Sequence, residues 1–166
     1  MMIILAFLPL QYQAANWKNT EASLTAFGVA YIAMRLLFDW IPDQRGGNVT
    51  AVASLLTECF GLFIIWSATS TTIAILGAAL AGLGCSLLFP ALGKVAIRLL
   101  PDENGGVVLG AYMACFDWGL TIGGPVAGVI AHWYGVHAVF AGGSLAALVG
   151  AVILLVFGSS PRYFEI

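Results

Sequence analysis

Charge is scarce in this sequence. Its 166 residues include six Lys and Arg and eight Asp and Glu, or 8% charged residues, whereas about a quarter of an average soluble domain is charged. With 61% hydrophobic residues, the chain has more apolar surface than a core of this size can bury. The excess predicts contact with lipid. The net charge of -2 gives no reason to expect nucleic acid, which is bound by a basic stripe.

The sequence also lacks the motifs of metal sites and of common catalytic centres. Cys59, Cys85 and Cys115 occur singly, without CxxC spacing, and are interpreted as packing residues. His132 and His137 flank the turn HWYGVH, where a metal pair is one interpretation and a place at the membrane interface beside aromatic residues is the favoured one. No nucleophile–base pair or phosphate loop is visible. We therefore predict no enzyme, no cofactor and no metal.

Long apolar runs separated by turn residues are present instead. A helix needs about 20 apolar residues to cross the hydrocarbon core of a bilayer, and these runs lack the alternation of strands. The sequence therefore predicts an all-α integral membrane protein. Five runs qualify as spans: residues 21 to 39, 49 to 67, 71 to 92, 107 to 133 and 136 to 158.

The first apolar stretch is too short to be a sixth span. Residues 1 to 13 are either the core of a signal peptide or, as we favour because no basic start or cleavage site is apparent, a partial transmembrane helix. The predicted organisation is this partial helix, a five-helix membrane domain over 14 to 158, and a tail over 159 to 166.

The cations predict the orientation of the chain. If the helices alternate, five of the six fall on one side and only Lys18 on the other, and the side rich in Lys and Arg is cytoplasmic. The tail is then cytoplasmic and the protein lies in the plasma membrane. Lys94 and Arg98 share a helix face and are interpreted as an interfacial anchor or, alternatively, as part of a substrate site. The five are Arg35, Arg45, Lys94, Arg98 and Arg162.

Two acidic residues fall inside predicted spans. Glu58 and Asp117 each place a carboxyl near the bilayer centre, where a charge costs about 3 kcal/mol even on lenient insertion scales. Such residues normally face a bundle interior or an aqueous cavity. Asp117, with Thr121 one turn later, is predicted to couple protons or contact substrate. The alternative, favoured for Glu58, is a neutral carboxyl that hydrogen-bonds a neighbouring helix.

Two further groups suggest movement. Gly123, Gly124, Pro125 and Gly128 lie in one span, where small residues four apart allow close helix packing and proline invites a bend. Near the end of the first span, Arg35 is predicted either to pair with Asp39 along the helix or to form part of a gate.

Two stretches resemble the major facilitator superfamily (MFS), in particular bacterial efflux carriers of the arabinose or drug-export type. FPALGKVAIRLLPDENGGVVLGAYMACFDWGLTIGGPVAGVIA, residues 89 to 131, is similar to the tenth and eleventh helices of that group. RLLFDWIPDQRGG, residues 35 to 47, resembles the loop motif G-x-L-P-D-R-x-G-G/R between helices eight and nine. Asp43 and Gly46 match its acid and glycine. Asp39 and Gln44 replace its first glycine and its arginine, and Arg45 offers a charge at the next position.

The resemblance implies the C-terminal six-helix half of a transporter in the bacterial inner membrane. The expected function is export of a small organic solute or drug by alternating access, coupled to protons as an antiporter, since GGPVAG over 123 to 128 is similar to a motif of antiporters. It also implies a switching role for the loop and a partner: the N-terminal half that would complete the pathway. The alternatives are a truncated or split product without transport activity, and a small membrane protein that associates with itself.

Overall fold

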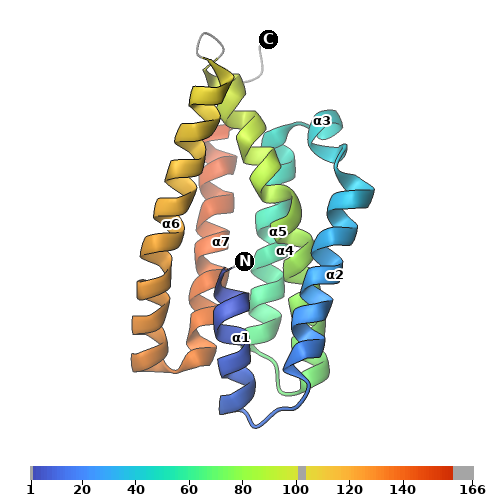
Figure 1. The fold of residues 1–166 in the computed structure, drawn as a ribbon, viewed down its shortest axis with the longest axis vertical. Coiled ribbons are helices and arrows are strands. Elements are labelled where there is room, and N and C mark those ends of the chain that lie inside the picture. The colour runs from blue at the N-terminus through green and yellow to red at the C-terminus, as the bar shows by residue number, and fades with distance from the viewer. Residues whose placement is uncertain (1, 101–103, 159–166) are drawn as a thin grey trace.

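The computed structural model describes residues 2–100 and 104–158, and all regular secondary structure in these ranges is helical (Figure 1). Five of the helices, α2, α4, α5, α6 and α7, are long and apolar enough to cross a membrane. The predicted all-α membrane class with five spans is therefore confirmed. The expected cytoplasmic tail, with Arg162, lies outside the described residues. The bounds are α1 Met2–Ala14, α2 Thr20–Phe38, α3 Ile41–Arg45, α4 Gly47–Trp66, α5 Thr71–Leu99, α6 Gly105–Tyr134 and α7 Val136–Gly158.

Turn residues set several of the helix ends. Gly46, with φ +84°, separates α3 from α4, and this backbone conformation favours glycine over any residue with a Cβ. The side chain of Asn104 accepts a hydrogen bond of 3.0 Å from the Gly106 amide at the start of α6, as N-cap residues do. Two elements differ from the sequence prediction. The link after α2 contains the one-turn helix α3, and α5 continues through Pro90 to Leu99 rather than ending near residue 92.

Helix α5 is the centre of the bundle. Its most extensive contacts are with α4 and α2, and α4 also packs on α7. By contrast, α6 touches α7 and α5 over a small area and forms one side of the molecule (Figure 1). The connection that contains α3 and the end of α5 lie at one end of the bundle, and the link between α1 and α2 lies at the other.

Glycines of α4 and α5 allow this close packing. A Cβ added to Gly61 of α4 would lie under 3.0 Å from the backbone of Ala81, and one added to Gly84 of α5 would lie 2.5 Å from the Glu58 amide nitrogen. Small residues let helix backbones approach in this way. The sequence placed this role in the fourth span, but a Cβ on Gly119, Gly123 or Gly128 would have no heavy atom within 4 Å. Helix packing through these glycines of α6 is therefore not found among the described residues.

Helix α1 has only 13 residues and is too short to cross a membrane. It is nevertheless packed against the other helices. Ile4, Leu8 and Tyr12, spaced four apart, are fully buried on one face. The Tyr12 hydroxyl shares a hydrogen bond with buried Ser23 of α2 and donates a long one of 3.5 Å to the Thr71 carbonyl of α5. This buried polar contact joins three helices at the end opposite α3.

Candidate functional site

The carboxylate of Asp117 lies on a face of α6 that no other described helix covers. Asp117, Thr121 and Met113, which share this face, are all exposed. The Thr121 hydroxyl donates to the Asp117 backbone carbonyl over 2.8 Å. Within the described ranges the Asp117 carboxylate has no hydrogen-bond or ion-pair partner. A bond to a neighbouring helix, the structural alternative for this acid, is therefore not seen, and its side chain is open to a ligand or a partner.

The glycine–proline segment of α6 lies inside a continuous helix. The helix runs from Gly105 to Tyr134 with Pro125 in its interior. Gly123 and Gly128 have open space around them. A bend at this segment thus stays a prediction.

Glu58 has surroundings unlike those of Asp117. It is half-buried on α4 where that helix crosses α5, next to Gly84, and its side chain contacts the Cys85 thiol. Since α4 and α6 are not among the helix pairs with extensive contact, Glu58 and Asp117 do not form one site. The structural role favoured for Glu58 stays a prediction.

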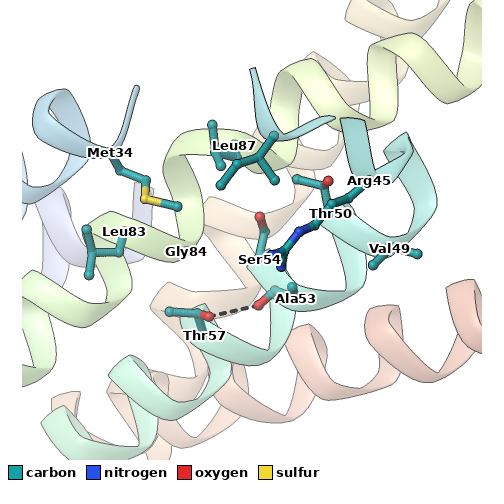
Figure 2. A pocket seen from close by; sticks show the side chains of 11 residues that line it. Met34, Arg45, Val49, Thr50, Ala53, Ser54, Thr57, Leu83, Gly84 and Leu87 are labelled. Carbon is teal, nitrogen blue, oxygen red and sulfur yellow. Dashed lines mark hydrogen bonds between the residues drawn. The ribbon is translucent and has the colours of Figure 1, made fainter. Parts of the chain in front are cut away.

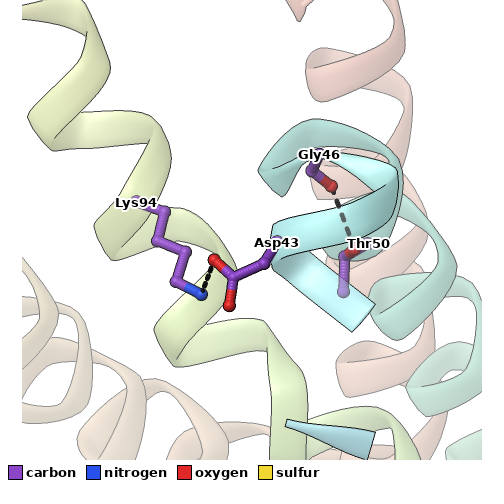
Figure 3. Close-up of polar contacts among 4 residues, drawn as sticks. All are labelled: Asp43, Gly46, Thr50 and Lys94. Atoms are coloured by element: carbon purple, nitrogen blue, oxygen red, sulfur yellow. Dashed lines mark hydrogen bonds and ion pairs between the residues drawn. The ribbon is translucent and has the colours of Figure 1, made fainter. Parts of the chain in front are cut away.

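The loop motif lies at the α3 end of the bundle and is tied to α5. Lys94 Nζ of α5 lies 2.5 Å from Asp43 Oδ1 of α3, and both side chains are solvent-accessible, 37% and 66% exposed (Figure 3). The Thr50 hydroxyl donates to the Gly46 carbonyl over 2.9 Å and supports the turn between α3 and α4. The acid and the glycine of the motif thus hold the loop against two helices.

Arg35 and Asp39, at the end of α2, are both exposed. They form no ion pair in the part of the chain that the structure describes. The predicted intrahelical pair is therefore not found among the described residues, although Asp39, the C-cap residue of α2, keeps a helical backbone conformation. The remaining interpretation of Arg35, as part of a gate, stays a prediction.

A pocket of about 290 Å³ lies between α2, α3, α4 and α5 near the same end (Figure 2). Arg45 lines it together with three hydroxyl-bearing residues of α4. The remaining walls are mostly apolar. The lining residues are Met34, Ile41, Arg45, Val49, Thr50, Ala53, Ser54, Thr57, Leu83, Gly84 and Leu87.

A comparison with protein families decides the class of the chain. The family model of the Major Facilitator Superfamily matches residues 1–163. The chain belongs to the major facilitator superfamily. No solved structure matches it.

Curated relatives of this MFS protein are named as uncharacterized MFS-type transporters. One from Salmonella typhimurium is 40% identical over 149 residues, which are 90% of this chain and 38% of the relative. Others from Burkholderia mallei and Burkholderia pseudomallei are 41% identical over 150 residues, 90% of this chain and 37% of each relative. The chain thus spans less than two fifths of the length of these relatives. The family and the spans make it a multi-pass membrane protein of a transporter family.

Two features of this MFS protein were missed at the sequence level. The ion pair of Asp43 with Lys94 joins residues 51 positions apart, which no local pattern predicts. The pocket-lining hydroxyls of Thr50, Ser54 and Thr57 follow a spacing of four and three that places them on one helix face. That spacing was visible in the sequence.

Proposed function

We propose that this chain is part of a secondary active exporter of a small organic solute or drug, and that a second set of helices covers α6. The uncovered carboxylate of Asp117 in a membrane span carries the proposal. A charge at the bilayer centre costs about 3 kcal/mol or more, so protein or water is a better neighbour for it than lipid.

Alternating access places the substrate between two helical halves that rock against each other. The five spans described here supply at most one side of such a pathway. The greater length of the relatives supports a partner half, because the aligned part is 38% of the Salmonella protein. We therefore expect the N-terminal half of the transporter to lie against the α6 face, with the substrate between the two.

Proton coupling is assigned to Asp117, with Thr121 beside it and Glu58 as a second candidate. A carboxyl that alternates between charged and neutral forms can favour a different conformation in each state. Antiport of protons against the exported solute would use this property. Bending of α6 at Gly123, Gly124, Pro125 and Gly128 would let the carboxyl open to one side of the membrane and then to the other.

The loop motif is proposed as the gate. Arg35, Asp39, Asp43, Arg45 and Gly46 belong to it. The bond of Asp43 to Lys94 would form in one state and break in the other. We place the α3 end in the cytoplasm of a bacterial cell, with the chain in the inner membrane, because Arg35, Arg45, Lys94 and Arg98 gather there while Lys18 lies in the link between α1 and α2.

The test is transport by the complete protein in membrane vesicles with an imposed pH gradient. We expect Asp117→Asn to abolish the acceleration of efflux by the gradient. The control Glu21→Gln, the same change of acid to amide at an exposed position in the first turn of α2, should keep it. Unchanged gradient-driven efflux in Asp117→Asn would remove the coupling role.

The open α6 face also fits a second copy of this chain, which is the competing candidate. Cys115 is exposed on α6 and serves as a probe. Oxidative crosslinking through Cys115 in membranes that contain the 166-residue chain alone would favour self-association. Monomers alone, together with transport only when further helices are co-expressed, would favour the two-half exporter. No transport under either condition would favour an inactive product.

A further inference from the structure

The pocket near α3 is a groove between α2 and α4, with α5 behind it. α2 and α4 both pack on α5 and have little contact with each other. Leu83, Gly84 and Leu87 of α5 form the floor, and Arg45 at the end of α3 lies at one end of the groove. Val49 and Ala53, both exposed, stand at its outer edge. The groove is therefore apolar along its length, open on its outer side and basic at one end.

No described residue neutralises the charge of Arg45. In the described ranges Arg45 makes no ion pair, and Asp43, two residues before it, is bound to Lys94. Figure 2 shows the Arg45 side chain lying along the pocket, with its guanidinium over the part lined by Ser54 and Ala53. A guanidinium beside an apolar groove attracts an anion, and its planar fork suits phosphate.

Ser54 supplies a second donor. Its side chain is 7% exposed and lines the pocket, yet its hydroxyl has no hydrogen-bond partner among the described residues. By contrast, Thr50 and Thr57 donate to carbonyls of their own chain, Gly46 and Ala53. No side-chain oxygen or nitrogen of the described residues is both buried and without a partner, so the Ser54 hydroxyl is open to the pocket and can donate to a ligand or to water there.

The position of the groove identifies the ligand class. The α3 end carries Arg35, Lys94 and Arg98 as well as Arg45, and such cations occur where a membrane helix meets the headgroup layer. The groove also has exposed apolar residues such as Val49, which is 57% exposed. A ligand with a phosphate at one end and an acyl chain at the other matches both properties.

We propose that this groove binds one anionic phospholipid, with its phosphate held by Arg45 and Ser54 and an acyl chain against Met34, Val49 and Leu87. This site is separate from the α6 face. It does not depend on transport, so either proposal can fail without the other.

The experiment is native mass spectrometry of the purified 166-residue chain in detergent with phosphatidylglycerol or phosphatidylcholine. We expect the wild type to retain phosphatidylglycerol in preference to phosphatidylcholine. Arg45→Gln should lower retention of phosphatidylglycerol roughly tenfold, because a hydrogen bond to a charged group is lost. Ala53→Phe, which fills the groove without changing charge, should lower it as well. Arg98→Gln, the same change at an exposed position of the same end, should not.

Three outcomes would overturn the proposal. One is equal loss in Arg98→Gln and Arg45→Gln, which indicates attraction by the whole basic end. The second is equal retention of both lipids by wild type and variants. The third is displacement of phosphatidylglycerol by an equal concentration of inorganic phosphate, which indicates a site for soluble anions. If gel filtration and circular dichroism show that Arg45→Gln or Ala53→Phe does not fold, Ser54→Ala replaces it, and unchanged lipid retention in Ser54→Ala would count against the site.

Discussion

Helices α5 and α6 are consecutive, of similar length and rich in glycine, yet their surroundings are opposite. In the most apolar stretch of α5, half of the residues are buried in the bundle. In that of α6, only 6% are buried. A Cβ added to Gly77, Gly82 or Gly84 of α5 would lie under 3.0 Å from another helix, whereas one added to Gly119 or Gly123 of α6 would have no heavy atom of another described helix within 4 Å. Glycine in a membrane helix therefore does not by itself indicate a helix contact.

The difference in burial between α5 and α6 corresponds to a difference in where their charged residues lie. The described part of α5 has no acidic residue and places its cations, Lys94 and Arg98, near one end. In α6 the acid Asp117 lies in mid-helix on the open face. The helix that is least covered is thus the one that carries a charge poorly suited to lipid, and this supports a covering partner.

The largest expected effect is that one substitution, glycine to alanine, changes the free energy of unfolding in opposite directions at the α4–α5 contact and on α6. Gly61→Ala should destabilise the fold by about 1–3 kcal/mol, because the new Cβ meets the Ala81 backbone of α5 and the helices must separate. Gly119→Ala on α6 should stabilise it by up to about 1 kcal/mol, the helix propensity gained. Thermal unfolding in detergent, followed by circular dichroism, measures both. Equal losses would show that α6 is as closely packed as α5.

A smaller difference is expected between two tyrosine hydroxyls. Tyr12→Phe removes a fully buried hydroxyl that bonds Ser23 and the Thr71 carbonyl, and we expect a loss of about 1–3 kcal/mol. Tyr112→Phe removes the 3.1 Å bond of α6 to the Phe89 carbonyl of α5, and we expect about 0.5–1.5 kcal/mol. The same unfolding measurement compares them. A greater loss in Tyr112→Phe would contradict the loose attachment of α6.

The smallest effect is expected at the ion pair that ties α3 to α5. A double-mutant cycle with Asp43→Asn and Lys94→Gln should give a coupling energy of about 0.2–1 kcal/mol, because both side chains are accessible to solvent. The coupling should fall as salt is added. A large coupling that is insensitive to salt would mean that the pair is shielded from water, and the gate would then be stiffer than proposed.

Local patterns predicted much of the fold because they act within one segment. Apolar runs between turn residues indicated the five spans, and the resemblance to the MFS loop motif placed Gly46 in the link before the second of them. The extension of α5 to Leu99 was missed because the span was counted from the apolar run over 71 to 92, whereas the helix continues past that run through Lys94 and Arg98. The pocket near Arg45 was missed because three separate helices and α3 form it.

The sequence by itself determined that this is a membrane protein of an MFS type, with five spans and two acids inside them. Only the tertiary structure decided that α5 is central and α6 peripheral, that Glu58 lies against α5 while Asp117 faces outward, and that Lys94 meets Asp43. The physical reason is that lipid and protein core are both apolar. Hydrophobic residues therefore mark a span but do not indicate which of its faces meets another helix.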